Sequence, residues 1–404
     1  MRILIMAWRN LWRYRRRTLV TVAAMTLALL IMVLYTSLVE GYLRDLERNI
    51  VDIELGDIQV FSPDYRDNPS IYNGIEDPEP LLAELRERGL GASARLIGGG
   101  LAAAGESSAG VMLKGIDLEQ DATVSQISQH IDQGSWLDTT DENGVVVGSR
   151  LAHTLGVAPG DELVLLGQST DGSIANDLYT VRGVLRSISE DADRGGIFMT
   201  ENAFRFFFAL PEGTHQIMIR RPAGRELPIA VAEVREIAAG LDVQSWRDLV
   251  PILATFLDST RSLIVIVFLV IYVVVAILII NAMLMSVFER INEIGVLKAL
   301  GVSPRHVLTL IFIEGGLQTA IAIAVALTLS IPGLVYLADH GLDLSGIGGM
   351  SFAGMAFDPV WRGVVTPWVI IGPVLTLVFI VSVSVLYPAL KAARISPVEA
   401  MRYQ

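Results

Sequence analysis

The chain has 404 residues, 52% of them hydrophobic, and a mean hydropathy of +0.51, which is high for a soluble protein. Its net charge of −12 argues against a nucleic-acid partner, and the absence of cysteine excludes thiolate metal sites and thiol catalysis. These totals favour a membrane protein.

Four apolar stretches divide the chain, at residues 18–39, 262–288, 315–338 and 363–390. Each exceeds the roughly 20 residues that a helix needs to cross the hydrocarbon layer of a membrane. A mostly polar segment of about 220 residues separates the first stretch from the second. The pattern predicts four transmembrane helices and one large folded domain on one side of the membrane.

Charge placement predicts the orientation. Residues 41–261 contain 35 acidic and 18 basic residues, a balance of −17 that leaves +5 for the rest of the chain. Basic residues gather in residues 1–17, 290–305 and 391–402. The positive-inside rule places these clusters in the cytoplasm, so we expect both termini inside and the acidic domain outside.

The predicted segments follow in chain order: a cytoplasmic amphipathic helix at 1–17, the first membrane helix at 18–40, an extracytoplasmic domain at 41–261, the second membrane helix at 262–288, a cytoplasmic amphipathic helix at 289–304, the third membrane helix at 307–338, an extracytoplasmic loop at 339–364, the fourth membrane helix at 365–388, and a cytoplasmic tail at 389–404.

Alternating strand and helix patterns predict an α+β fold for the extracytoplasmic domain. Residues 144–148 are typical of a buried strand, and 149–155 of a helix that Gly156 ends. Residues 91–110 are rich in Gly, Ala and Ser, and we expect a loop or a weak strand there.

No catalytic or cofactor-binding pattern is found. The dipeptide Gly-Lys never occurs, so the chain has no P-loop for ATP. The five histidines lack the spacing of metal ligands, and residues 105–110 lack the G-x-S-x-G spacing of a nucleophile elbow. We therefore expect a non-catalytic chain that holds no metal or cofactor itself.

Residues 288–304 carry the strongest local signal. Apolar residues recur there at helical spacing, with Gly301 placed as a C-terminal cap and Pro304 as the stop: Phe288, Ile291, Ile294, Leu297 and Leu300. Such a helix can rest on lipid headgroups, or it can insert its apolar ridge into a groove of a partner protein. The spacing alone favours neither interpretation.

Glu314 and Gln318 are polar residues within the predicted third membrane helix. A charge at the centre of a membrane helix costs about 2.5–3.5 kcal/mol on insertion scales, so it marks a proton relay or a structural polar contact. We favour the structural contact, with Gln318 placed to hydrogen-bond to Glu314. Gly315 and Gly316 would let another helix approach closely.

Residues 289–301 (ERINEIGVLKALG) resemble the E-R-x-x-E-I-G-x-x-x-A-x-G signature of FtsX-like ABC transporter permeases, a class that includes the MacB efflux and lipoprotein-releasing LolCDE systems. Residues 7–18 and 388–402 resemble the N-terminal and C-terminal motifs of the same class. The resemblance implies a MacB-like periplasmic core for the domain between the first two membrane helices.

In that family the segment between the second and third membrane helices is the coupling helix, which sits in a cleft of a separate cytoplasmic ATPase dimer that binds ATP and Mg²⁺. The resemblance implies this role for the matching positions, namely Glu289, Arg290, Glu293, Ile294, Gly295, Lys298 and Gly301. Helical spacing adds Leu297 and Leu300. A second permease subunit, identical or homologous, would complete the membrane part.

Residues 134–166 and 37–42 resemble lipoprotein-releasing permeases of the LolC/LolE type, although Glu40 stands where those proteins usually carry Asn. This resemblance implies release of lipoproteins from the outer leaflet of the bacterial inner membrane to a periplasmic carrier. We expect apolar residues of the first two membrane helices to line the cargo cavity: Met32, Tyr35, Leu38, Val39, Tyr42, Val265, Phe268 and Leu269. The alternative is mechanotransmission, in which the permease moves a periplasmic adaptor or regulates the cell envelope.

Overall fold

The computed structural model describes residues 2–13, 15–343, 351–352, 355–356 and 360–396. These residues form two compact units. The helical unit contains the described residues within 1–44, 257–346 and 360–404. The sheet domain contains residues 45–256 and the described residues within 347–359.

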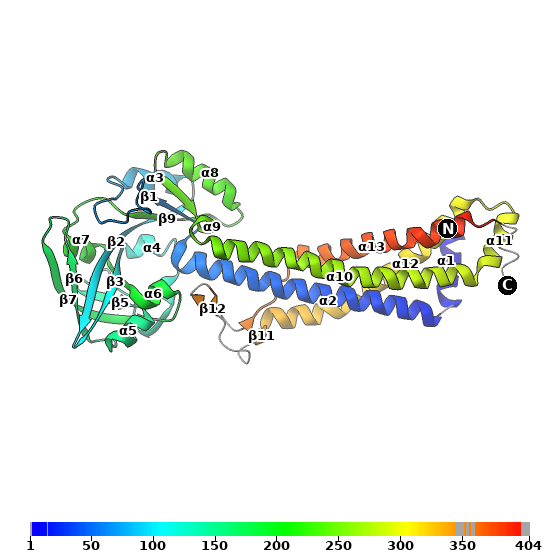
Figure 1. Ribbon diagram of the computed structural model, residues 1–404, viewed down its shortest axis with the longest axis horizontal. Coiled ribbons are helices and arrows are strands. Elements are labelled where there is room, and N and C mark those ends of the chain that lie inside the picture. The colour runs from blue at the N-terminus through cyan, green and yellow to red at the C-terminus, as the bar shows by residue number, and fades with distance from the viewer. Residues whose placement is uncertain (1, 14, 344–350, 353–354, 357–359, 397–404) are drawn as a thin grey trace. The chain divides into compact units, whose positions relative to one another are not determined.

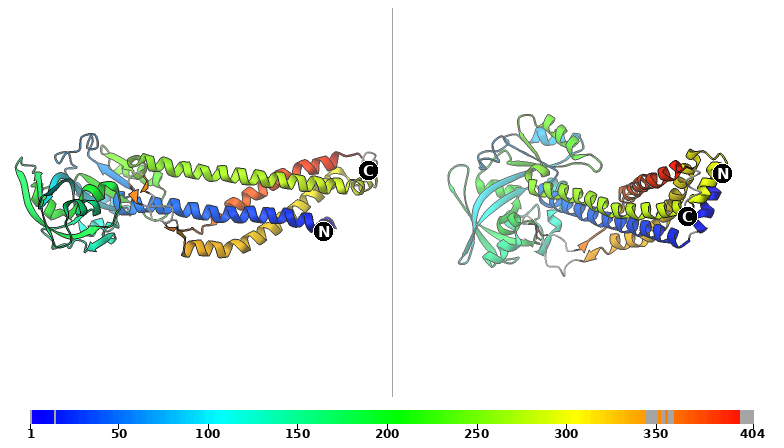
Figure 2. Two further views of the ribbon diagram at one scale, coloured as in Figure 1. Left: turned by 60° about the horizontal axis from the view of Figure 1, so that its bottom comes forward. Right: turned by 45° about the vertical axis from the view of Figure 1, so that its right-hand side comes forward.

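Within the described part of the chain, four helices are long and apolar enough to cross a membrane. They run side by side in the helical unit and are α2 (Arg15–Ile50), α10 (Pro251–Glu289), α12 (Pro304–Asp339) and α13 (Pro367–Arg394) (Figures 1 and 2). The predicted membrane segments overlap these four helices, each of which is longer than its predicted segment. Two short helices lie at one end of the unit, α1 (Arg2–Arg13) and α11 (Ile291–Ala299).

A cluster of buried apolar side chains between the four long helices holds them together. We call this cluster the seam. Met32 of α2, Tyr272 of α10 and Leu377 of α13 are fully buried in one cluster. The Tyr272 hydroxyl donates to the carbonyl oxygen of Pro373 at 2.9 Å, which satisfies its polar atom inside the apolar seam. Gly315 allows close helix packing as predicted, since a Cβ there would lie 2.9 Å from Val385 of α13. Gly316 has open space around it.

At the end of the helical unit far from α11, α2 is joined to the residues that precede α13. Tyr42 stacks on Trp361 with ring centroids 3.9 Å apart, and Ser37 Oγ donates to the carbonyl oxygen of Val364 at 2.9 Å. Strands β11 (Leu342–Asp343) and β14 (Val360–Trp361) pair there. The rest of the predicted loop 339–364 includes 344–350, 353–354 and 357–359, which lie outside the described residues, as do residues 397–404 of the predicted tail.

A mixed sheet forms the body of the sheet domain (Figure 1). Its strands are β1 (Ile58–Phe61), β2 (Gly91–Ala104), β3 (Ser107–Ile116), β4 (Ile131–Gly134), β5 (Gly144–Val147), β6 (Glu162–Gln168), β7 (Ile174–Leu185), β8 (Gly196–Thr200), β9 (Gln216–Arg220) and β10 (Asp242–Ser245). Its helices are the short π-helical turn Val51–Leu55, α3 (Glu79–Glu87), α4 (Leu118–Asp121), the 3-10 turn Ile127–Gln129, α5 (Ser149–Leu155), α6 (Glu190–Gly195), α7 (Glu201–Phe208), α8 (Leu227–Ile237) and α9 (Trp246–Leu249).

Six of these strands close on themselves. The order β2-β3-β8-β5-β7-β6 returns to β2, because β6 pairs with both β2 and β7. Strands β9, β1 and β10 extend the sheet beyond β2. The predicted strand at 144–148 and helix at 149–155 are confirmed by β5 and α5, and Gly156 caps α5 in the left-handed conformation with φ of 70°.

Of the two alternatives expected for residues 91–110, a loop or a weak strand, the structure shows a strand. Strand β2 has 14 residues, despite its low β-propensity, because it pairs with β3 on one edge and with β9 and β6 on the other. Small residues are required in it: a Cβ at Gly98 would lie 2.6 Å from the ring of Phe208. Tertiary packing of α7 against the sheet therefore selects glycine at a position where local preference favours a loop.

A buried histidine links the stability of the sheet domain to pH. His215 Nδ1 accepts from the backbone N–H of Ile97 at 3.0 Å, which leaves Nε2–H to donate to the carbonyl oxygen of Ile71 at 3.0 Å. Burial lowers the pKa of this imidazole below its usual value of 6.5. The neutral form is therefore the one that the fold holds.

We expect the domain to lose stability as the pH falls below about 6.5, because the unfolded chain binds a proton there that the folded domain resists. The slope contributed by one histidine is at most about 1.4 kcal/mol per pH unit. Thermal unfolding of the protein between pH 8 and 5 measures it. His215→Gln should flatten the slope, whereas His153→Gln, at an exposed position of α5, should leave it unchanged.

Candidate functional site

Helix α11 is a separate short helix because both of its ends are fixed locally. Arg290 lies between α10 and α11 with φ of −111° and ψ of 16°, which breaks the continuous helix. At the other end the N–H of Val302 donates to the carbonyl oxygen of Leu297, and that of Gly301 to Lys298, with Gly301 at a φ of 92°. This is a Schellman motif, for which glycine is the preferred residue. The predicted Gly301 cap is confirmed, and Pro304 begins α12.

Arg290 points into the helical unit and makes a buried ion pair with Glu314 of α12. Its Nη1 and Nη2 donate to Oε1 and Oε2 of Glu314 at 3.0 and 2.7 Å. Nη2 also donates to Ser286 Oγ at 2.7 Å. The two residues are only 9% and 4% exposed. The pair neutralises a carboxylate that would be costly in an apolar membrane helix, and it fixes the start of α11 against α12.

The structural contact predicted for Glu314 is thus present, with partners other than the predicted one. Gln318 is buried one turn along α12, and among the described residues no hydrogen bond joins it to Glu314. Glu314 Oε1 instead accepts from Asn10 Nδ2 of α1 at 2.6 Å. Asn10 lies within the motif at residues 7–18 that resembles the N-terminal motif of the class, and that motif is the signal in the sequence that marks it.

Two further ion pairs connect the N-terminal segment to this site. Arg13 Nη1 lies 2.9 Å from Glu293 Oε1 of α11, and Arg17 Nη1 lies 2.9 Å from Glu289 Oε2 at the end of α10. The first pair is solvent-exposed and the second is half-buried. Two of the predicted coupling residues therefore contact the chain's own N-terminal segment.

Lys298 ties α11 to the last turn of α13. Its Nζ donates to the carbonyl oxygens of Ala393 at 2.8 Å and Ile395 at 2.5 Å. These carbonyl groups lie at a helix C-terminus, where a cation is favourable. Together with Arg290 and Glu293, Lys298 connects α11 to three other helices. We call α1, α11 and the adjoining ends of α10, α12 and α13 the junction.

Most of the apolar ridge predicted for docking faces the protein itself. Ile291 is buried, Ile294 packs against the seam between the long helices, and Leu297 lines a cavity of about 90 Å³ beside Glu314. Leu300 of the ridge is 78% exposed, and Val296, which lies outside the predicted ridge, is 50% exposed. Helical spacing identified the amphipathic helix, but it could not show which face the other helices cover.

The proposed cargo-cavity residues fall into two groups. Met32, Val39 and Tyr42 of α2 are buried by the chain itself, while Tyr35 and Phe268 pack against the seam. Leu38 is half-buried. In contrast, Val265 and Leu269 on α10 are exposed at 65% and 63%. The structure therefore does not bring the eight residues together into one wall.

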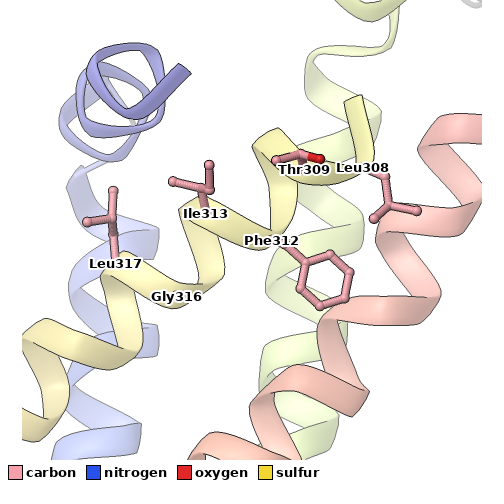
Figure 3. Close-up of a pocket in the computed structure, with 6 residues that line it drawn as sticks. All are labelled: Leu308, Thr309, Phe312, Ile313, Gly316 and Leu317. Atoms are coloured by element: carbon pink, nitrogen blue, oxygen red, sulfur yellow. The ribbon is translucent and has the colours of Figure 1, made fainter. Parts of the chain in front are cut away.

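An open groove of about 600 Å³ lies on α12 (Figure 3). All six lining residues belong to that helix, with Phe312 and Leu308 directed toward α13 and Ile313 and Leu317 directed away from it. The lining is apolar apart from the hydroxyl of Thr309. Such a surface on a membrane helix suits lipid tails and offers no catalytic group.

Over the described part of the chain, no cluster of three or more His, Asp or Glu side chains could hold a metal ion. Arg290, Glu293 and Glu314 at the junction are held in ion pairs that connect helices. The arrangement can transmit a displacement of α11 to α1, α12 and α13.

Two protein families match this chain. The FtsX-like permease C-terminal family matches residues 265–397, and the MacB-like periplasmic core domain family matches residues 18–237. The second match covers more than half of the chain, and the two together include the junction from α11 to α13 and nearly all of the sheet domain.

Individual relatives agree with the families. The lipoprotein-releasing system transmembrane protein LolC of Xylella fastidiosa is 24% identical over 74% of this chain and 75% of its own length. LolC of Neisseria meningitidis serogroup B is 22% identical over 96% of this chain and 94% of its own length. The uncharacterized ABC transporter permease YknZ of Bacillus subtilis is 32% identical over 45% of this chain and 38% of its own length.

Among solved structures, the periplasmic region of MacB from Actinobacillus actinomycetemcomitans covers 48% of this chain and 90% of its own, with 12% identity and a TM-score of 0.35. That score is too low to add to the assignment, which depends on the family matches and the sequence relatives. The chain belongs to the FtsX-like and MacB-type family of ABC transporter permeases.

Proposed function

We propose that this chain is the permease subunit of a complex that releases lipoproteins, or similar lipidic cargo, from the outer leaflet of the bacterial inner membrane. A separate cytoplasmic ATPase dimer would bind ATP and Mg²⁺, and a second permease subunit would complete the membrane part. The observation that carries the cargo class is the similarity to LolC along 96% of the chain. In this arrangement both termini and α11 are cytoplasmic, and the sheet domain is periplasmic.

The junction supports the ATPase contact. Val296 of α11 and Leu300 at its C-cap are exposed to solvent, while Arg290, Glu293 and Lys298 hold its other faces against the neighbouring helices. When a partner binds the free face of a helix whose other faces are anchored, a displacement of that helix is transmitted to the helices that anchor it. Arg290 would then serve coupling by holding the helix, without touching the ATPase.

Cargo would contact α10. A multi-acylated anchor needs apolar walls, because each exposed CH₂ costs about 0.8 kcal/mol. Val265 and Leu269 are exposed and apolar, whereas Met32 and Tyr42 are covered by the chain's own side chains. We therefore assign the wall to α10 together with the second permease subunit.

Site-directed cross-linking tests the cargo. Because the chain has no cysteine, Leu269→Cys provides one attachment point for a benzophenone maleimide. We expect light to join it to acyl-labelled lipoproteins in membranes. Val335→Cys, at a position of α12 that is 52% exposed, is the matched control and should give no adduct beyond lipid.

Equal labelling at the two positions would refute lipoprotein passage and favour mechanotransmission. The burial of Met32 and Tyr42 favours this second candidate, because a chain that only transmits force needs no cavity wall on α2. In that case the cross-linking partner of the sheet domain would be a periplasmic adaptor or regulator, not a lipoprotein carrier.

A further inference from the structure

Helix α1 and the start of α2 are attached to the other helices of the junction by polar contacts around a small cavity. Three side chains of residues 10–17 reach three different elements: Asn10 reaches Glu314 of α12, Arg13 reaches Glu293 of α11, and Arg17 reaches Glu289 of α10. The cavity of about 90 Å³ lies between the same elements and is lined by Met6 and Asn10 of α1. The hydrogen bond and the two ion pairs therefore help to fix the position of α1 and of the start of α2.

Glu314 is the shared anchor of this arrangement. One of its carboxylate oxygens, Oε1, accepts from both Asn10 and Arg290, and the other accepts from Arg290 alone. The buried charge is neutralised by Arg290, so Asn10 is not needed to keep the carboxylate in the apolar interior. Its hydrogen bond instead sets the position of α1 relative to the ion pair that holds α11.

The opposite face of α1 is apolar and exposed. Trp8 and Trp12 are 45% and 55% exposed, and their rings meet edge to face with centroids 6.1 Å apart. Aromatic residues of this kind anchor helices at a membrane interface. Helix α1 thus presents one face for the membrane surface and another that contacts the junction.

We infer that Asn10, Arg13 and Arg17 are positioning residues for coupling. Asn10 and Arg13 hold α1 against α12 and α11, and Arg17, at the start of α2, holds α2 against the end of α10. A displacement of α11 is thereby passed through α1 to α2. Helix α1 ends at Arg13 and α2 begins at Arg15, so little chain is available to absorb a movement between them. This inference depends on the proposed function in one respect, namely that α11 receives force from an ATPase.

The contact itself is tested by cross-linking, which does not depend on ATP. Arg17→Cys with Glu289→Cys should join readily through a short bismaleimide in the full chain, which has no other cysteine. Arg16→Cys with Glu289→Cys is the matched control, since Arg16 is the adjacent, exposed residue. Mass spectrometry of the linked peptides gives the yields. Equal yields for the two pairs would overturn the inference.

The positioning role is tested with the assembled transporter. Asn10→Leu removes the hydrogen bond to a charged acceptor at similar side-chain volume, and we expect about tenfold lower cargo release per ATP hydrolysed. Arg9→Glu, at the adjacent and exposed position on α1, changes more charge and should have little effect. Arg17→Glu should impair coupling, and the exchanged pair Arg17→Glu with Glu289→Arg should restore it.

The outcomes separate the possibilities. If Asn10→Leu matches wild type and the exchanged pair restores nothing, α1 is a membrane anchor only and the inference is wrong. If wild type itself shows no link between hydrolysis and release, the proposed function fails, and the cross-linking yields alone decide whether the start of α2, which follows α1, is held against the end of α10.

Discussion

Replacing Leu300 by aspartate should abolish coupling to the ATPase and leave the chain folded. Leu300 is 78% exposed at the end of α11, so a carboxylate there meets water and costs the isolated chain little. In the complex the same carboxylate would be buried against the ATPase without a partner, at a cost of several kcal/mol. We expect loss of co-purifying ATPase at a normal level of folded protein.

The control is Ser303→Asp, which adds the same charge three residues away at the N-cap of α12, where aspartate is equally suitable. It should retain the ATPase. Leu297→Asp is a poorer test than helical spacing implied, since Leu297 lines the cavity beside Glu314 and its change would also disturb the junction. Retention of the ATPase by Leu300→Asp would place the docking surface elsewhere.

Replacing Glu314 by leucine should destabilise the helical unit strongly. The change removes the carboxylate that neutralises the buried Arg290 guanidinium, and breaking a buried ion pair by removing one partner costs about 3–5 kcal/mol. Thermal unfolding in detergent, followed by tryptophan fluorescence, measures the loss.

Two variants check this explanation. Gln318→Leu, one turn along α12, should have a much smaller effect, because no hydrogen bond of Gln318 is found within the described residues. The double variant Glu314→Leu with Arg290→Met should recover most of the stability, since replacing a buried ion pair by apolar side chains is often neutral. If the double variant is as unstable as Glu314→Leu, the cost does not arise from the unpaired charge.

The two predictions concern different properties of one short helix. Leu300 lies on the face that remains free, and Glu314 anchors the face that is held. A permease that transmits force needs both, because a free face without anchors would move without consequence. Uncoupling and unfolding should therefore separate cleanly between these two positions.

Much of the architecture follows from the sequence alone. Four apolar stretches of sufficient length predicted the four long helices, since the backbone in a membrane must satisfy its hydrogen bonds within a helix. The motif at 289–301 predicted the family, and Gly301 predicted the end of α11. Each of these depends on local chemistry or on a pattern that is contiguous in the chain.

The tertiary structure decided what each face contacts. Periodicity placed Ile291, Ile294 and Leu300 on one ridge, but packing against the long helices covers the first two and leaves the third exposed. Asn10 and Glu314 are 304 residues apart, so no local pattern could pair them. Strand β2 forms against its local preference because three neighbouring strands supply its hydrogen bonds. The sequence by itself determined which segments are helices and to which family the chain belongs, and only long-range packing decided which side chains hold the junction and which remain free for a partner.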